Sequence, residues 1–256
     1  MALLEIRGVT KAFGGLRALN EVTLAVEVGQ IKGLIGPNGA GKTTLFNVIS
    51  GMVRAEAGEV WFGGRRLDGL PPHEVAQRGL GRTFQQVRLF RGMTVLENVM
   101  TGCHHRTRAE MLAAVLSPPW VRREERAIKA DALELLRFVG LEAQAGTLAV
   151  HLSFGQQRLL ELARGLAMNP RLLLLDEPAA GLNSYETEGL GQLIRHLRDR
   201  GLTVLVVEHD MSLVMTVCDE VAVLNFGHKI ADGSPGTIQV TPAVIDAYLG
   251  GSSGGP

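Results

Sequence analysis

The feature that most constrains this chain is the stretch Gly36-Pro-Asn-Gly-Ala-Gly-Lys-Thr-Thr44, which matches the phosphate-loop pattern G-x-x-x-x-G-K-[ST]. Residues 31–35 before it are expected to form a buried strand. Residues 42–50 after it place apolar side chains at helical spacing, which predicts a helix. Glycines let such a loop turn tightly, so that backbone N–H groups and the positive end of the helix face one anion. A glycine-rich turn is the alternative, but the strand and helix on either side favour a nucleotide-binding site.

Length and composition are those of an ordinary globular protein. A chain of 256 residues can bury a full core, and its 46% hydrophobic and 20% charged residues are typical of a folded domain. Basic and acidic residues number 26 each, so no global positive field attracts nucleic acid or anionic lipid. Cys103 and Cys218 lack metal-ligand spacing, which favours reduced thiols.

The sequence carries no segment typical of membrane insertion or export. Uninterrupted apolar runs stay well below the roughly 18 residues that a membrane-spanning helix needs. The first residues, Met-Ala-Leu-Leu-Glu-Ile, lack the basic start of a signal peptide, and Glu5 falls where its apolar core would lie. We therefore expect a chain that has no transmembrane segment and is not exported.

Strand and helix patterns alternate along most of the chain and predict an α/β fold. Strands are expected at residues 3–9, 22–26, 31–35, 58–62, 80–84, 172–175, 203–207, 221–225 and 229–232. The runs at 172–175 and 203–207 are apolar throughout, as in the central strands of a mainly parallel sheet with crossover helices. The first strands are expected to form an N-terminal antiparallel region, and the last two a hairpin.

One helical segment interrupts this alternation. From about residue 93 the spacing becomes helical, which predicts a helical subdomain insert over residues 93–152 of a single domain spanning 1–256. An arginine-rich stretch within it, at Arg122, Arg123 and Arg126, alternates with glutamates and favours a solvated helix face over a nucleic-acid patch. A last helix is expected at 242–249, followed by a flexible tail at 250–256.

Charged side chains follow two of the buried strands, where parallel sheets present their ligands. Asp176 is expected to hold Mg²⁺ together with the Thr43 hydroxyl, and Glu177 to act as general base on the attacking water. His209 is expected to contact the γ-phosphate, while Lys42 reaches the β- and γ-phosphates. The alternatives are that the carboxylate pair caps the next helix and that His209 is structural.

Phe13 lies shortly before the phosphate loop, next to a Gly-Gly turn. An aromatic side chain at this place can stack on a nucleotide base. The alternative is that the ring anchors the turn in the core.

The motif Leu152-Ser-Phe-Gly-Gln-Gln157 resembles the signature motif of ATP-binding cassette (ABC) ATPases, and a helix is expected after it at 158–168. The order of the other motifs is similar to that family as well. Phe13 corresponds to the A-loop aromatic, residues 36–44 to Walker A, Gln85 to the Q-loop, residues 172–176 to Walker B, residues 180–183 to the D-loop and His209 to the switch histidine. The resemblance covers nearly the whole chain.

Two departures from the general family pattern narrow the resemblance. Phe154 replaces the first glycine of Leu-Ser-Gly-Gly-Gln, and Asn183 replaces the D-loop aspartate. Both, together with the segment 83–90 and the arginine-rich insert, are similar to the ATPase subunits of branched-chain amino-acid importers. Related subunits serve urea or amide importers, and the ATPase does not touch the cargo, so the solute stays open.

The resemblance implies a set of site residues. It assigns catalysis to Glu177, His209 and Gln85, and metal binding to Thr43, Gln85 and Asp176. The nucleotide is expected to contact Phe13, Gly36, Pro37, Asn38, Gly39, Ala40, Gly41, Lys42, Thr43 and Thr44 of one chain, and Ser153, Gly155 and Gln156 of the chain facing it.

The resemblance also implies cofactors, partners and location. The cofactors are ATP and Mg²⁺. The partners are a second cassette (identical or related), transmembrane permease subunits and, indirectly, a solute-binding protein, and no nucleic acid is expected. The expected location is the cytoplasmic face of the membrane. Two other classes compete with this interpretation. Soluble ABC proteins that act on ribosomes or DNA ends usually carry two cassettes or a long coiled coil, and a regulatory module without turnover is disfavoured by the presence of Glu177 and His209.

Overall fold

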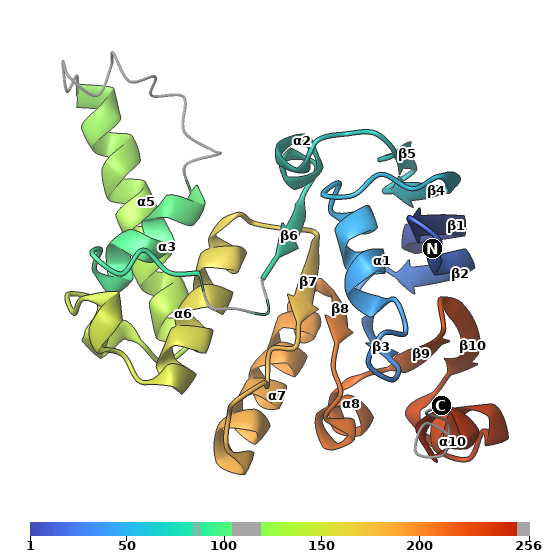
Figure 1. Ribbon diagram of the computed structural model, residues 1–256. Coiled ribbons are helices and arrows are strands. Elements are labelled where there is room, and N and C mark those ends of the chain that lie inside the picture. The colour runs from blue at the N-terminus through green and yellow to red at the C-terminus, as the bar shows by residue number, and fades with distance from the viewer. Residues whose placement is uncertain (84, 86–87, 104–118, 250–256) are drawn as a thin grey trace. The chain divides into compact units, whose positions relative to one another are not determined.

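The computed structural model describes residues 1–83, 85, 88–103 and 119–249 (Figure 1). Two compact units are present: residues 1–82 with 171 onward, and residues 83–170. The predicted insert at 93–152 falls inside the second unit, while the predicted tail at 250–256 lies outside the described residues. Within the described part of the chain, no helix has both the length and the apolar character needed to cross a membrane.

A six-stranded sheet forms the centre of the first unit, in the order β10-β9-β3-β8-β7-β6. Its strands are β3 (Ile31–Ile35), β6 (Leu80–Arg82), β7 (Leu172–Asp176), β8 (Thr203–Val207), β9 (Glu220–Asn225) and β10 (His228–Gly233). The pairs β9–β3, β3–β8, β8–β7 and β7–β6 are parallel, and β10 is antiparallel to β9. All residues of β3, β7 and β8 are buried, as expected for strands covered on both faces. The mainly parallel sheet and the terminal hairpin are confirmed.

The N-terminal antiparallel region is confirmed as a four-stranded sheet in the order β2-β1-β4-β5. It consists of β1 (Ala2–Phe13), β2 (Leu16–Glu27), β4 (Ala57–Phe62) and β5 (Arg65–Arg66). β1 and β2 extend further than the sequence pattern predicts, because they pair up to Phe13 and Leu16 on either side of a tight turn. Gly14 in this turn has φ +57°, a conformation that glycine adopts readily.

Helix α1 (Lys42–Ile49) lies between the two sheets (Figure 1). Its residues Leu45, Phe46 and Ile49 belong to one buried cluster with Ile6 of the antiparallel sheet and Leu205 of the parallel sheet. Burial of such apolar side chains is the main favourable term in folding. The core of the first unit therefore forms around the helix that follows the phosphate loop.

Five further helices of the first unit lie within the described residues. They are α2 (Pro72–Gln77), α7 (Ser184–Asp199), α8 (Met211–Val217), α9 (Pro235–Gln239) and α10 (Pro242–Leu249). Helix α7 follows β7 and α8 follows β8, which is the crossover arrangement predicted for the parallel strands. The last helix occupies the predicted residues 242–249.

The second unit is helical. It contains α3 (Val95–Cys103), α5 (Pro119–Phe138) and α6 (Phe154–Ala167), with short 3₁₀ turns at Glu142–Gln144 and Ala149–His151, and α3 packs against both α5 and α6. Arg123 and Arg126 on α5 are exposed, in agreement with a solvated face. Helix α6 begins at Phe154 rather than at 158, so the predicted start was wrong. The physical reason is that Ser153 caps this helix from inside the signature motif.

Candidate functional site

The loop between β3 and α1 depends on its glycines. Gly39 and Gly41 have φ of +79° and +103°, in the left-handed region that favours glycine. A Cβ added to Gly41 would lie 2.5 Å from the carbonyl oxygen of Ala18, and one added to Gly36 would lie 2.1 Å from that of Leu224. Larger residues at these two positions would therefore force the backbone apart. The phosphate-loop motif corresponds to a backbone shape that requires glycine.

The amino end of α1 is open. Gly41 is its N-cap residue, and no side chain among the described residues caps the helix. The first N–H groups of an α-helix have no carbonyl partner within the helix, and they carry the positive end of its dipole. This end of α1 therefore offers hydrogen-bond donors to an anion.

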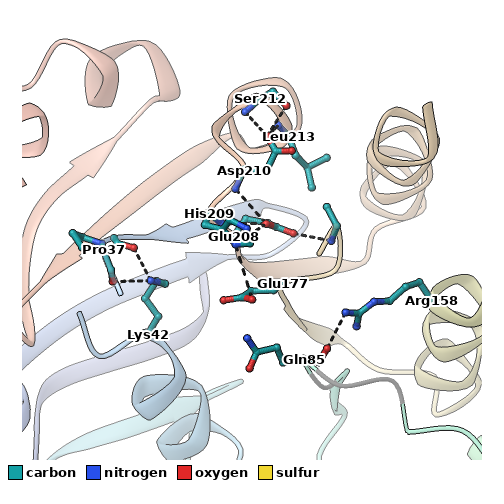
Figure 2. A network of polar contacts seen from close by, with 12 residues as sticks. Pro37, Lys42, Gln85, Arg158, Glu177, Glu208, His209, Asp210, Ser212 and Leu213 are labelled. Carbon is teal, nitrogen blue, oxygen red and sulfur yellow. Dashed lines mark hydrogen bonds and ion pairs between the residues drawn. The ribbon is translucent and has the colours of Figure 1, made fainter. Parts of the chain in front are cut away.

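Lys42 folds back over the loop (Figure 2). Its Nζ donates to the carbonyl oxygens of Gly36 at 2.6 Å and Pro37 at 3.0 Å. Burial lowers the pKa of the ammonium group, and the charges of Glu177 and Asp176 act against this shift. A positive charge is thus held inside the loop, close to two carboxylates.

Asp176 ends β7 and is buried, with Oδ2 3.0 Å from Nη2 of Arg82. Burial raises the pKa of this carboxyl group, and the hydrogen bond and charge of Arg82 oppose the rise. Thr43, in the first turn of α1, is exposed. The carboxylate and the hydroxyl are hard oxygen donors, the type that Mg²⁺ prefers together with phosphate oxygens. The donor chemistry present therefore fits the predicted metal.

Glu177 and His209 lie close together on the loops after β7 and β8 (Figure 2). Nδ1 of His209 is 4.0 Å from a carboxylate oxygen of Glu177, and the imidazole is largely exposed. Glu177 has φ +48°, which is uncommon for a residue with a side chain. The amide of Glu177 donates to the carbonyl of Val207 at 2.9 Å, which ties the end of β7 to the end of β8.

Phe13, at the end of β1, is 50% exposed, so it is not the core anchor considered as the alternative. Nζ of Lys11 lies 5.0 Å from the centre of its ring. An exposed aromatic face next to a cation is compatible with stacking on a nucleotide base, and this role stays a prediction.

The other predicted residues belong to the second unit. Gln85 is exposed, and Nη2 of Arg158 donates to its main-chain carbonyl at 2.8 Å. Ser153 and Gln156 form a capping box at the start of α6: the Gln156 amide donates to Ser153 Oγ at 3.3 Å, and the Ser153 amide donates to Gln156 Oε1 at 3.0 Å. Gly155 is buried in the first turn of this helix.

The predicted site residues therefore fall into two groups. The first unit carries Phe13, residues 36–44, Asp176, Glu177 and His209, and it brings Lys42 close to Asp176 and Glu177, and Glu177 close to His209. The second unit carries Gln85, Ser153, Gly155 and Gln156. Two compact units of one chain thus share the predicted set.

Sequence reasoning missed two charged residues beside this site. Arg82 pairs with Asp176, and Glu208 is fully buried between the loops that carry Glu177 and His209. A signal was present for both, because Arg82 ends a strand of otherwise apolar or small residues and Glu208 directly follows another. Such residues are rarely buried unless they have partners.

Comparison with known proteins is consistent with this geometry. Residues 19–180 match the family model described as ABC transporter. The chain is 47% identical to BraF of Pseudomonas aeruginosa, a high-affinity branched-chain amino acid transport ATP-binding protein, over 97% of this chain and 98% of BraF.

Two solved structures are similar as well. The ADP conformation of MJ1267, an ATP-binding cassette of an ABC transporter, superposes with a TM-score of 0.85 at 32% identity and covers 98% of this chain and 99% of MJ1267. MJ0796, a bacterial ABC transporter cassette solved as a dimer, has a TM-score of 0.77 at 29% identity and covers 91% of this chain and 98% of MJ0796. This chain therefore belongs to the ABC transporter family, and it is an ATPase of that family.

Proposed function

We propose that this chain is the ATP-hydrolysing subunit of an importer for branched-chain amino acids, in which ATP-driven pairing of two cassettes is coupled to solute transport. The observation that carries the proposal is the similarity to BraF over nearly the full length of both chains. The alternatives are the ATPase of a urea, amide or other ABC transporter, and a soluble ABC ATPase without a transport role.

The first unit supplies the nucleotide site in this proposal. The β- and γ-phosphates bind the amides at the open end of α1 and the ammonium group of Lys42, and the base stacks on Phe13. Thr43, Asp176 and Gln85 would hold Mg²⁺. When bound, the metal ion neutralises negative charge on the phosphates.

The proposal assigns hydrolysis to Glu177, His209 and Gln85. Glu177 takes a proton from the attacking water as general base, because its carboxylate lies at the carboxyl edge of the sheet beside the loop. His209 donates a hydrogen bond to the γ-phosphate, and Gln85 helps to position the water and the metal ion.

A second cassette completes the site. Ser153, Gly155 and Gln156 lie at the amino end of α6, which is the kind of anion site that a helix start provides. MJ0796 was solved as a dimer, which supports the pairing of two cassettes. In this proposal these residues face the phosphates held by the other chain. ATP then closes the pair, and hydrolysis reopens it. Transmembrane permease subunits would receive this motion at the cytoplasmic face of the membrane. A solute-binding protein outside the membrane would be an indirect partner.

Replacement of Glu177 by Gln tests the catalytic assignment. Loss of the base should lower turnover in the assembled complex by about 10²-fold or more, while ATP binding and ATP-dependent association persist. Glu134→Gln, at an exposed carboxylate on α5, serves as the control and should keep normal turnover. Near-normal hydrolysis in the Glu177→Gln complex would show that another group activates the water.

The solute is tested in the native membrane complex. Subunits that co-purify with the tagged chain are identified by mass spectrometry, and ATP hydrolysis is measured with the co-purified binding protein plus leucine, isoleucine, valine or urea. Stimulation by branched-chain amino acids supports the proposal. Stimulation by urea alone, or the absence of any membrane subunit from the purified complex, would replace it with one of the alternatives.

A further inference from the structure

A fully buried carboxylate lies between the two loops that carry Glu177 and His209. Glu208 directly follows the buried strand β8, and its side chain has 0% exposure. A charged side chain in such a place is costly unless it is well hydrogen-bonded. Its partners therefore indicate what the residue does.

Among the described residues, Glu208 accepts hydrogen bonds from three main-chain amides (Figure 2). Oε1 accepts the N–H of Ala179 at 2.8 Å, and Oε2 accepts the N–H groups of His209 at 3.1 Å and Asp210 at 3.4 Å. Ala179 belongs to the loop after β7, and His209 and Asp210 belong to the loop after β8. A single carboxylate thus joins both loops.

The loop after β7 needs such support. Glu177 has a left-handed backbone, which persists only where its surroundings hold it in place. The N–H of Ala180 closes the turn onto the carbonyl of Glu177 at 3.1 Å, and the neighbouring N–H of Ala179 is taken up by Glu208. Glu208 therefore stabilises the turn that sets the direction of the Glu177 side chain.

The loop after β8 is held from both ends. Asp210 caps α8 through Oδ1, which accepts the N–H of Ser212 at 2.8 Å, and Glu208 holds the amides of His209 and Asp210. The imidazole itself is exposed, with Nδ1 3.9 Å from Glu208 Oε2 and 4.0 Å from Glu177 Oε2. The main chain of His209 is therefore fixed while its side chain faces outward.

We propose that Glu208 is a positioning residue for ATP hydrolysis, which sets the placement of Glu177 relative to His209 by binding the main chain of both loops. This inference rests on the proposed roles of Glu177 and His209. Glu208 acts through the amides and does not contact the nucleotide.

Glu208→Gln tests the proposal with a side chain of nearly the same size. The amide nitrogen of glutamine is a donor, so it cannot accept an N–H, and one of the two loops loses its acceptor. Turnover of the full chain in its membrane complex should fall roughly tenfold or more, since small misplacements of catalytic groups are costly. The dissociation constant for ATP should change by less than about twofold.

The matched control is Asp219→Asn. Asp219 Oδ2 also accepts a main-chain amide, that of Ile31 at 2.7 Å, but at the opposite end of the same sheet. Both variants exchange a loop-binding carboxylate for an amide, and only Glu208→Gln should lower turnover per folded molecule. Equal turnover in the two variants would overturn the proposal.

A double variant separates positioning from a general structural loss. In the Glu177→Gln background the catalytic carboxylate is already absent, so adding Glu208→Gln should lower the residual turnover by less than about twofold. Full multiplication of the two losses would mean that Glu208 acts independently of Glu177, against the proposal. If Glu177→Gln alone leaves turnover intact, the proposed function of Glu177 fails first, which is a distinguishable result.

The unmodified chain provides a test that does not depend on the folding of a variant. Amide hydrogen exchange followed by NMR should show the N–H groups of Ala179 and His209 protected, because a buried carboxylate accepts both. Exchange as fast as that of exposed loop amides would contradict the proposed contacts.

Discussion

Helices α1 and α6 both begin beside residues expected to face phosphate, but they begin in opposite ways. Helix α1 starts after Gly41 with no capping side chain in the described part of the chain. Helix α6 starts with a complete capping box, in which Ser153 and Gln156 bind each other's main-chain amides. A capping side chain contributes about 1 kcal/mol to helix stability, so α6 has local support at its start that α1 lacks.

Helix α1 is stabilised at other places. Phe46 is fully buried, and the carboxyl end of the helix is held by Arg82, whose Nη1 donates to Asn47 Oδ1 and to Ser50 Oγ, both at 2.8 Å. The same guanidinium binds Asp176 through Nη2. Anchoring at one end and along one face leaves the amino end of α1 open for a ligand.

The capped start of α6 does not exclude a ligand. Ser153 Oγ accepts the Gln156 amide through a lone pair, and a hydroxyl group that accepts one hydrogen bond can still donate another. The start of α1 thus depends on tertiary anchoring, and the start of α6 on its own side chains. Substitutions at the two helix starts should therefore have effects of different size on stability and on ATP binding.

The largest expected effect is that of Arg82→Met, which removes the anchor of α1 and the buried cation beside Asp176. Breaking a buried ion pair from one side costs about 3–5 kcal/mol of unfolding free energy. Burial raises the pKa of Asp176, and Arg82 opposes this rise. Without Arg82, the pKa of Asp176 in the folded chain therefore lies further above its value in the unfolded chain. The folded chain then binds more protons, so the loss should be largest near neutral pH and shrink as the pH falls through the folded-state pKa.

Urea unfolding of the full chain at several pH values measures this effect. Arg66→Met is the matched control, because Arg66 is an exposed arginine that pairs with Glu59 and Asp68. Surface pairs of this kind contribute about 0–1 kcal/mol. A loss for Arg82→Met no larger than that of the control would disprove the anchoring role.

The next largest effect concerns the open start of α1. Lys42→Met keeps the size of the side chain and removes the ammonium group. Hydrogen bonds to charged groups contribute about 1.5–3 kcal/mol, so the dissociation constant for ATP should rise by about 10- to 100-fold. Titration calorimetry with Mg²⁺ and ATP measures it.

Lys32→Met provides the control for this variant. Lys32 is a buried lysine that pairs with Glu220 and Asp232, away from the phosphate loop. It should lower thermal stability without changing ATP affinity. Unchanged affinity in Lys42→Met would argue against the loop as the phosphate site.

The smallest effect on stability is expected at the capped start of α6. Ser153→Ala should cost about 1 kcal/mol of unfolding free energy, since the N-cap acceptor is lost. If Ser153 also binds the phosphate of the facing cassette, the variant should bind ATP at its own site but fail to support hydrolysis at the opposite one. Defined pairs of normal and variant cassettes allow the two sites to be measured separately.

Ser234→Ala is the matched control, because Ser234 caps α9 through the amide of Thr237. It should lower stability slightly and leave hydrolysis intact at both sites. If Ser153→Ala impaired only the site on its own chain, the model of two cassettes facing each other would be wrong.

Features that depend only on neighbouring residues could be predicted from the sequence. The phosphate loop was predictable because its glycines adopt backbone conformations that other residues disfavour. β3 and β8 were predictable because, apart from Lys32 in β3, their residues are apolar or small enough to be buried. The start of α6 was also present in the sequence, as Ser153 followed three residues later by Gln156. The predicted start at 158 overlooked that local signal.

Contacts between distant charged residues, in contrast, depend on the tertiary structure. Arg82 and Asp176 are 94 positions apart, and Glu208 and Ala179 are 29 apart. Hydrophobic periodicity predicts which side of a strand is buried, but it does not specify which strands are neighbours. The order β3-β8-β7-β6 places the ends of β6, β7 and β8 side by side, and their polar ends come into contact for that reason.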